Sequence, residues 1–469
     1  MLKLIRKATN EDIEQINTLG EQLHHNFVKT YHIETEIDNK MAIVLVAENK
    51  GIVGYLYAID LGDNIDLLSI FVDKKSRYQH IGTDLIDKLK SLNKDKTITL
   101  EVSSTNTAAI SLYKKSDFKE VGIRKNYYKN SDAIKMKDTY ILAIETSCDE
   151  TSIAIVKNGC EVTAITILTQ MYTHANFGGV VPEIASRMHT ENITKVLEET
   201  LKKANMSVSD VDAIAVTQKP GLLGSLLVGI EFAKVLSYVY NKPLIAVNHL
   251  IGHIYANAIN KKLEFPLLAL VVSGGHTELV IMKDDYDFEF LGGTLDDAIG
   301  EAYDKVARIL GIPYPGGPGI EKKALEGKVT YDFPRPVMDN TYNFSYSGLK
   351  SRIINVVNNE KQKGNDIREA DLAASFQYVA IDELARKTDL ALKNTGIKNV
   401  IVAGGVSANK YLRAEIAKVA EKNGAKLSIP EFIYCTDNAA MIGAAAYPLY
   451  LRKQFADYSL NGESQADVC

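Results

Sequence analysis

The sequence predicts an α/β protein built in two parts. Short apolar runs of the kind that forms buried strands alternate with amphipathic helical stretches along most of the 469 residues. Loops rich in glycine and hydroxyl residues follow several of these runs, and the charge balance changes after Asp138. Up to that residue the chain holds 21 basic and 20 acidic residues, whereas the remainder holds 33 and 39. We therefore expect one domain at residues 1–138 and a second at residues 139–469.

The composition favours a protein of the reducing cytoplasm. Hydrophobic residues make up 46% of the chain and charged residues 24%, which is usual for globular proteins. We find no run of about 18 apolar residues and no secretory leader, so we expect neither a membrane span nor export. Four cysteines are too few for a disulfide framework. The net charge of −5 excludes a globally basic nucleic-acid binder, although the basic stretch 114–137 allows a local patch.

In the first part we expect strands at Ala42–Glu48, Gly51–Ile59, Leu67–Val72 and Thr97–Val102, and helices from Gly82 and over Thr107–Lys115. A loop from Arg77 to Thr83 leads from the third strand into the first helix. Backbone N–H groups at a helix N-terminus bind anions, and Gly82 lets the backbone come close to a ligand. This loop is therefore a candidate pyrophosphate site.

Together with Glu101, Asn106, Ser111–Tyr113 and the stretch 124–128, this loop resembles the GNAT acetyltransferases, and within them the RimI-type ribosomal-protein-alanine N-acetyltransferases. The resemblance implies a mixed sheet with flanking helices, acetyl-CoA as co-substrate, and the N-terminal alanine of a ribosomal protein as acceptor. Glu101 is then the general base and Tyr113 the acid that protonates the leaving thiolate. The residues expected to contact acetyl-CoA are Ile70, Phe71, Val72, Arg77, Gln79, Gly82, Thr83 and Asn106.

One residue departs from this family's pattern. His80 stands where the loop normally has its first glycine, and a side chain there would crowd the pyrophosphate. The alternative is therefore a degenerate domain that is only structural.

The second part opens on the apolar strand 140–144, with almost no linker before it. Two strand pairs (141–145 with 152–156, and 267–273 with 278–281) and the buried-type strands Ala213–Thr217 and Val400–Ala403 alternate with long amphipathic helices. Three loops of small residues, 145–151, 272–277 and 403–409, lie at the ends of such strands. Taken in this order, they resemble the actin-like, Hsp70 and sugar-kinase (ASKHA) superfamily, which implies a duplicated, two-lobe fold.

A candidate metal site follows from His249 and His253. On a helix, residues i and i+4 project from one face, so both imidazoles can hold one ion. Leu250 occupies the position at which a zinc protease has its catalytic glutamate, so proteolysis is poorly supported. Asp437 is the third candidate ligand, and two histidines with one carboxylate describe a Lewis-acid site with open positions.

Eight motifs of this part resemble the TsaD family, the tRNA N6-adenosine threonylcarbamoyltransferases: residues 249–253, 272–277, 294–298, 300–308, 313–318, 344–350, 404–409 and 435–441. The resemblance implies transfer of the threonylcarbamoyl group of threonylcarbamoyl-AMP to N6 of adenosine 37 in tRNAs that read codons starting with A (t6A modification). His249, His253 and Asp437 would hold the metal, Fe(II) by family expectation, with zinc possible from the ligand types. The residues expected to bind the adenylate are Val272, Ser273, Gly274, Gly275, His276, Asp304, Gly317 and Asn409. Asp149, in the first loop, is our candidate proton acceptor.

The resemblance also implies partners: tRNA, a paralogous non-catalytic subunit, an ATPase subunit, and a synthase that makes the adenylate. Two other functions stay open, an actin-like ATPase or sugar kinase with a GNAT regulatory domain, and a non-catalytic scaffold. The histidine pair argues against the kinase, because such enzymes hold Mg²⁺ with carboxylates. We expect the tail Asn461–Cys469 to be frayed.

Overall fold

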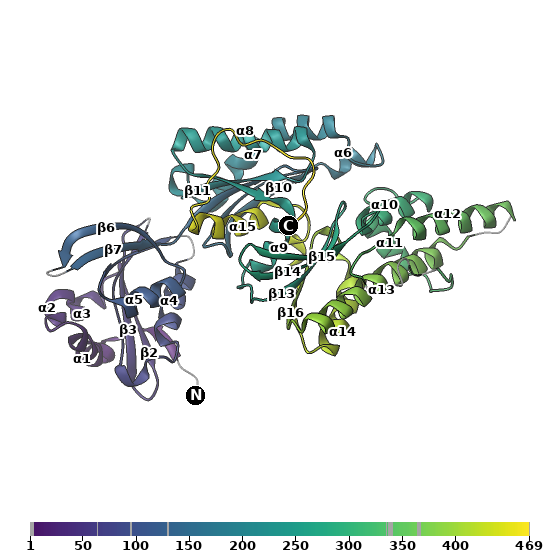
Figure 1. Ribbon diagram of the computed structural model, residues 1–469. Coiled ribbons are helices and arrows are strands. Elements are labelled where there is room, and N and C mark those ends of the chain that lie inside the picture. Colours follow the sequence, from purple (N-terminus) through teal and green to yellow (C-terminus); the bar gives the residue numbers. More distant parts are fainter. Residues whose placement is uncertain are drawn as a thin grey trace. The chain divides into compact units, whose positions relative to one another are not determined.

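The computed structural model describes residues 4–62, 64–93, 96–128, 131–333, 335, 341–363 and 367–468. The chain forms two compact units, Met1–Thr139 and Tyr140–Cys469. Each unit combines helices with β-sheet (Figure 1), so the predicted α/β class is confirmed.

The first unit is built on a seven-stranded sheet. In spatial order its strands are β1 (Leu4–Lys7), β2 (Ala42–Glu48), β3 (Ile52–Asp60), β4 (Asn64–Val72), β5 (Thr97–Ser103), β7 (Ser131–Lys137) and β6 (Lys119–Tyr128). Neighbouring strands are antiparallel except β4 and β5, which are parallel. The basic stretch 114–137 includes β6 and β7, and residues 121–125 of β6 are exposed.

Helices cover both faces of this sheet because its strands are apolar on both sides. In β3, Tyr55 and Tyr57 pack against α1 (Ile13–Leu23) and α2 (Phe27–Tyr31), which are followed by the short α3 (Ile33–Glu36). The alternate residues Leu56 and Ala58 pack on the opposite face with α4 (Ile81–Leu92) and α5 (Thr107–Lys115). This alternation is the two-residue period of a strand whose two faces are both buried.

A partly buried ion pair between Arg6 and Asp12 fixes the start of the first unit. Asp12 is 4% exposed and accepts hydrogen bonds from two nitrogens of Arg6, at 2.7 and 2.9 Å, and from the N–H of Thr9 at 2.8 Å. The hydrogen bonds from Arg6 outweigh the effect of burial and lower the pKa of Asp12 to about 2. Because the pKa is lower in the folded state, the stabilisation is present above the ordinary value of 3.8 and is lost as the pH falls through about 2.

We expect Asp12→Ala to lower the free energy of unfolding of the first unit by about 2 kcal/mol at pH 7. Hydrogen exchange of peptides from residues 4–62 in the full chain measures this loss. Asp38→Ala, at an exposed aspartate of the same unit, is the matched control. Equal exchange in both variants would contradict the assignment.

The second unit contains two five-stranded sheets with the same topology. Their orders are β10-β9-β8-β11-β12 and β15-β14-β13-β16-β17. In each sheet the first three strands are antiparallel and the last three are parallel. The first sheet comprises β8 (Tyr140–Glu145), β9 (Glu150–Lys157), β10 (Glu161–Thr169), β11 (Ala213–Lys219) and β12 (Leu244–Asn248); the second comprises β13 (Leu267–Val272), β14 (Thr277–Asp284), β15 (Asp287–Gly293), β16 (Asn399–Ala403) and β17 (Lys426–Ser428). The predicted duplicated, two-lobe fold is thus confirmed.

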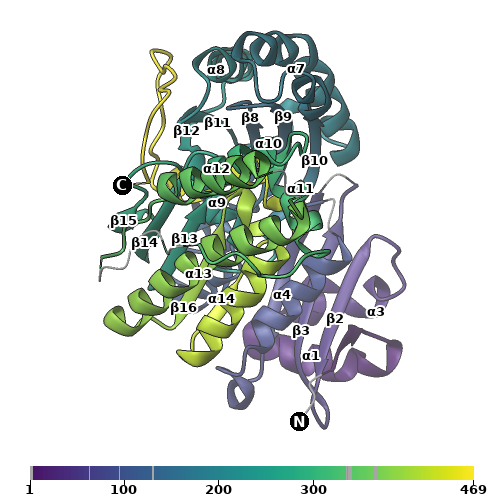
Figure 2. The same ribbon diagram turned by 90° about the vertical axis from the view of Figure 1, so that its right-hand side faces the viewer.

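Helices α7 (Pro182–Ala204) and α8 (Leu223–Tyr240) belong to the first lobe, after the short α6 (Met171–Ala175). The second lobe carries α10 (Ile299–Ile309), α11 (Gly316–Ala324), α12 (Ser347–Gln362), α13 (Glu369–Thr395) and α14 (Lys410–Lys422). Figure 2 shows α12, α13 and α14 in front of the strands of the second sheet, with α7 and α8 at the top of the view.

Two further helices, α9 (His249–Tyr255) and α15 (Ala439–Leu451), lie in the core that the two lobes share. That core joins residues of both sheets with both helices. Glycines allow the close packing: a Cβ on Gly252 would lie 2.9 Å from the Ile442 side chain, and one on Gly443 would lie 2.5 Å from Val156. The helix pair is therefore held firmly where the lobes meet.

Helix α8 is the part of the described chain that comes nearest to a membrane span, although Glu231 and Lys234 interrupt its apolar residues. Leu223–Tyr240 meets the criteria of length and composition, but core helices of soluble proteins meet them too. In the structure α8 packs against β11 and α7, and 39% of it is buried. Its apolar composition is accounted for in part by these contacts.

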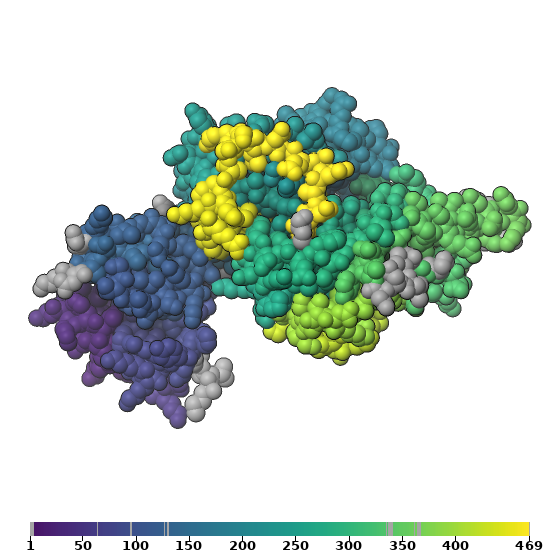
Figure 3. Space-filling model, viewed as in Figure 1, coloured from purple at the N-terminus to yellow at the C-terminus, as the bar shows by residue number. Residues whose placement is uncertain are grey.

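The expectation of a frayed tail is wrong for residues 461–468. Lys219 forms an ion pair with Glu463 at 3.1 Å, and Asn248 donates a hydrogen bond to the carbonyl of Asp467 at 2.9 Å. Val468 is only 5% exposed and belongs to the shared core. Figure 3 shows this tail, in yellow, as an arc across the surface of the first lobe.

Candidate functional site

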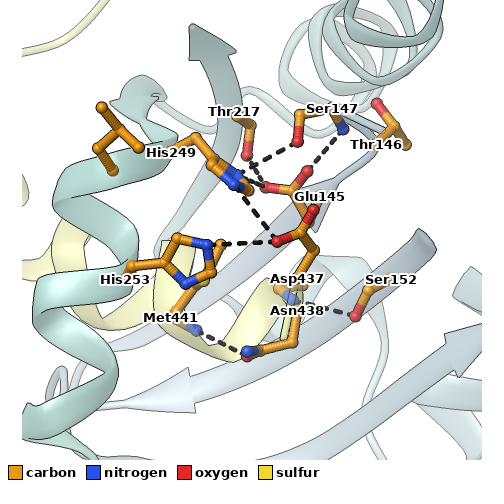
Figure 4. A network of polar contacts seen from close by, with 12 residues as sticks. Glu145, Thr146, Ser147, Ser152, Thr217, His249, His253, Asp437, Asn438 and Met441 are labelled. Carbon is orange, nitrogen blue, oxygen red and sulfur yellow. Dashed lines mark hydrogen bonds and ion pairs between the residues drawn. The ribbon is translucent and has the colours of Figure 1, made fainter. Parts of the chain in front are cut away.

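Helices α9 and α15 bring the three predicted metal ligands together. Asn248 caps α9, because its side chain accepts hydrogen bonds from the N–H groups of Leu250 and Ile251 at 2.8 and 3.3 Å. The helix therefore begins at His249, and His253 follows one turn later on the same face. Asp437 lies just before α15, at the turn capped by Asn438. Figure 4 shows both imidazoles and the carboxylate pointing toward one another.

The distances between these groups suit a bound cation. Nε2 of His249 and Nε2 of His253 each lie 3.3 Å from Oδ1 of Asp437. Ligand atoms about 2.1 Å from one ion are about 3–3.5 Å from each other. His253 is 1% exposed, and apart from the 3.3 Å contact of Nε2 with Asp437 its ring nitrogens have no hydrogen-bond partner among the described residues. Because buried polar atoms are usually hydrogen-bonded, this poorly satisfied imidazole supports a metal at the site.

Glu145, which the sequence analysis did not single out, orients His249. Its Oε2 lies 3.2 Å from Nδ1 of His249, and the carboxylate accepts hydrogen bonds from Oγ1 of Thr217 at 2.5 Å and N–H of Ser147 at 2.6 Å. A carboxylate behind a metal-binding histidine fixes its ring and tautomer. Burial opposes the charge on both groups. Attraction to His249 nevertheless holds the pKa of Glu145 below its ordinary value, against burial and the negative charge of Asp437, and attraction to Asp437 and Glu145 holds the pKa of His249 well above its ordinary value.

Asp149 lies close to a second carboxyl group, Glu150. Asp149 is 8% exposed and shares a hydrogen bond with the side chain of Glu150. Burial, reinforced by the negative charges of Asp437 and Asp149, raises the pKa of Glu150 to about 10. This shift favours the protonated form of Glu150, which can share its proton with Asp149.

The loop 272–276 turns tightly between β13 and β14. The N–H of Ser273 donates to the carbonyl of His276 at 2.9 Å, and the N–H of His276 donates to Oγ of Ser273 at 3.1 Å. A Cβ on Gly274 or Gly275 would meet nothing within 4 Å, so the loop faces open space. Gly404 packs behind it at φ +90°, where a Cβ would lie 2.3 Å from the carbonyl oxygen of Val272. Only glycine fits at that position.

The side chains of the other predicted adenylate-binding residues lie beside the starts of α11 and α14. Asp304 of α10 accepts hydrogen bonds from the N–H groups of Gly316, at 2.8 Å, and Gly317, where α11 begins. Asn409 caps α14 by accepting from the N–H of Leu412 at 2.9 Å, and it donates to Gln377 at 3.0 Å. These contacts fix the helix ends, where N–H groups favour anions.

In the first unit, the predicted coenzyme residues lie where β4 and β5 separate. The two strands pair only from Asn64–Thr97 to Leu67–Leu100. Residues 68–72, which include Ile70, Phe71 and Val72, therefore have no partner strand on the β5 side. A free strand edge can pair with the amides of an extended ligand. Arg77 lies near this edge, because its Nε donates to the carbonyl of Val72 at 3.2 Å.

The remaining coenzyme residues lie at the starts of the two helices that follow. Gly82, in the first turn of α4, is buried, and a Cβ there would lie 3.0 Å from Leu112. Gln79 and Thr83 lie on either side of His80–Gly82, and Asn106 caps α5 by accepting from the N–H of Ala109 at 3.1 Å.

Glu101 and Tyr113 have different surroundings. Glu101 is the first residue of β5 beyond the pairing with β4, and its carboxylate accepts hydrogen bonds from Arg124 at 2.9 and 3.2 Å. Tyr113 is 7% exposed and packs edge-on against Phe118, and burial raises the pKa of its phenol. Arg124 was not predicted as a site residue. It lies on β6 and Glu101 lies on β5, with β7 between them, so the contact follows from the sheet order and not from the local sequence.

His80 occupies a backbone conformation that favours glycine, with φ +61° at the N-cap of α4. Replacing it with glycine removes both the strain, about 1 kcal/mol, and the side chain beside the loop N–H groups. We expect His80→Gly to bind acetyl-CoA roughly fivefold tighter, as measured by calorimetry on the full chain. Tyr78→Gly is the control, because Tyr78 also has φ +61° but lies before the helix cap. A gain in Tyr78→Gly alone would contradict the argument.

Comparisons with known proteins follow the same division. A family model described as tRNA N6-adenosine threonylcarbamoyltransferase matches residues 161–444, and one described as acetyltransferase (GNAT) domain matches residues 6–139. The tRNA N6-adenosine threonylcarbamoyltransferase of Staphylococcus saprophyticus is 54% identical over 331 residues, which are 70% of this chain and 97% of that protein. The protein of the same name from Staphylococcus aureus strain Newman is 54% identical over 333 residues, 71% and 98% of the two chains. The crystal structure of the ribosomal-protein-S18-alanine N-acetyltransferase from Escherichia coli shares 25% identity, covers 29% of this chain and 92% of its own, and has a TM-score of 0.27.

Proposed function

The chain belongs to the tRNA N6-adenosine threonylcarbamoyltransferase family, and from this premise we propose that its second unit makes t6A. In this reaction the threonylcarbamoyl group of threonylcarbamoyl-AMP moves to N6 of adenosine 37 in tRNAs that read codons starting with A. The resemblance predicted from the sequence is confirmed for both parts of the chain by the family models. The setting that fits these reactions is the bacterial cytoplasm.

The observation that carries the proposal is the convergence of His249, His253 and Asp437 where the lobes meet. Fe(II) is the metal we propose for this site, with zinc as the alternative for the same donors. When bound, the metal polarises the threonylcarbamoyl carbonyl as a Lewis acid. A kinase of the same fold would hold Mg²⁺ with carboxylates, so two imidazoles at this position argue against a kinase.

The chain's own groups then bind and orient the reactants. The N–H groups of Gly274 and Gly275, which face open space in the loop 272–276, bind the phosphate of the adenylate, and Asp304, Gly317 and Asn409 hold its nucleoside side. N6 of adenosine attacks the carbamoyl carbon, the bond from this carbon to the phosphate oxygen breaks, and AMP leaves. Asp149 accepts the proton that N6 loses. An exocyclic amine is a weak nucleophile, so positioning of this kind accounts for much of the rate.

For the first unit we propose acetyl transfer from acetyl-CoA to the N-terminal alanine of a ribosomal protein. The free edge of β4 binds the pantetheine, residues 77–83 bind the pyrophosphate, and Glu101 accepts a proton from the amine. The partners of the second unit are tRNA, a paralogous non-catalytic subunit and an ATPase subunit.

The test is formation of t6A on an unmodified tRNA transcript, detected by mass spectrometry of the digested nucleosides. The reaction contains the purified, metal-loaded full chain, synthase-generated adenylate and the partner subunits. We expect t6A with the wild type and none with His249→Ala/His253→Ala. No t6A from the wild type would contradict the proposal, and ATP turnover without tRNA would favour the kinase.

A further inference from the structure

A second group of metal-ligand side chains lies beside the loop 272–276. It consists of His276 at the end of the loop, Glu278 on β14 and Asp467 on the tail. One ligand atom from each of the three lies within 4.8 Å of the others. None of these residues belongs to the centre formed by His249, His253 and Asp437.

Glu278 is the buried member of this group and lacks compensation for its charge. Its side chain is 4% exposed, and the N–H of Val468 donates a hydrogen bond to the carboxylate. Oε2, however, is buried with no hydrogen-bond partner among the described residues. Among the residues that the structure describes, no lysine or arginine forms an ion pair with Glu278 or Asp467. A buried, unpaired carboxylate oxygen is costly, so this oxygen is a ready ligand for a cation.

His276 is suited to be the nitrogen ligand. Its ring donates a hydrogen bond to the carbonyl of Ala466, which fixes the imidazole against the tail. A neutral imidazole that donates through one nitrogen has a lone pair on the other.

We propose that His276, Glu278 and Asp467 form a second cation site, which takes a divalent transition-metal ion such as Mn²⁺ or Zn²⁺. One imidazole and two carboxylates are donors that these ions accept. Since Asp467 comes from the tail and His276 from the loop, the ion fastens the tail to the loop. The tail is also held by Gln218, Lys219 and Asn248 of the first lobe and by the hydrogen bonds to His276 and Glu278 of the second. The ion thereby strengthens the link between the two lobes through the tail.

The experiment counts bound cations in the full chain by equilibrium dialysis against Mn²⁺ or Zn²⁺ with elemental analysis. His249→Ala/His253→Ala removes the first site and serves as the background. We expect one cation per chain in this background, and an affinity at least about tenfold weaker when Glu278→Gln or Asp467→Asn is added. Glu463→Gln is the matched control, because Glu463 is a tail carboxylate that pairs with Lys219 instead. It should retain the cation.

A second measurement tests the fastening of the tail. Hydrogen exchange of residues 464–468 should slow when Mn²⁺ is added to the background, and this slowing should be absent in the Glu278→Gln and Asp467→Asn variants. Glu278→Gln preserves the shape of the side chain and Asp467 is exposed, so both variants should fold. A background that binds no cation, or binding unchanged in both variants, would overturn the site. A bound cation that leaves tail exchange unchanged would overturn the fastening. None of these results depends on t6A formation.

Discussion

Asp437→Ala is expected to lose its metal and to form t6A at least about 10³-fold more slowly than the wild type. The carboxylate lies 3.3 Å from both imidazoles, so its removal leaves two neutral ligands for a divalent ion. Lewis-acid stabilisation is worth several kcal/mol, and about 4 kcal/mol corresponds to 10³-fold in rate. Elemental analysis of the purified variant and single-turnover t6A formation measure the two losses.

Glu145→Gln is expected to weaken metal binding less than Asp437→Ala does, and the two variants can be compared. It leaves the three ligands in place but removes the charge behind Nδ1 of His249, so we expect metal affinity to fall 10- to 100-fold. Excess metal should restore t6A formation in Glu145→Gln and not in Asp437→Ala. If Asp437→Ala kept its metal and its rate, the assigned centre would be incorrect. If excess metal failed to rescue Glu145→Gln, Glu145 would act on the reaction by another route.

The contrast between these residues shows what local sequence could predict. His249 and His253 are recognisable because a helical repeat places them on one face, and Asp437 was identified through its motif. Glu145 gave no such signal, since it stands 104 residues before His249 and meets it only after β8, β11 and α9 have assembled. Its partner Thr217 lies 72 residues away. Contacts of this kind follow from tertiary packing and not from spacing.

The tail shows the same limit in a segment with no periodicity. Residues 461–468 are mostly polar, and this composition predicted fraying. Their order in the structure comes from partners more than 200 residues away, such as Gln218 for Asn461 and Asn248 for Asp467. Helix α8 shows the converse, because its composition meets the criteria of a membrane span while the structure packs it against β11 and α7.

Strand positions were predicted better than strand neighbours. The apolar runs predicted β2, β4 and β5 closely, but nothing in them showed that β4 and β5 stop pairing after Leu67 and Leu100. This separation depends on the register of the whole sheet. It places Glu101 at the point where the free edge of β4 begins, so its carboxylate lies beside the expected acetyl-CoA site, where a base is needed.

Glu101→Gln is expected to lower kcat for acetyl transfer by about 10²- to 10⁴-fold and to leave the KM for acetyl-CoA nearly unchanged. An α-ammonium group must lose a proton before it attacks, and glutamine keeps the shape of the side chain but cannot accept one. Thiol release from acetyl-CoA with a peptide that begins with alanine measures the rate. The matched control is Glu120→Gln, at a carboxylate of β6 whose exposed partner is Lys114; it should behave as the wild type. An active Glu101→Gln would place the base elsewhere, whereas an inactive wild type would support a first unit that is only structural, with His80 as the reason.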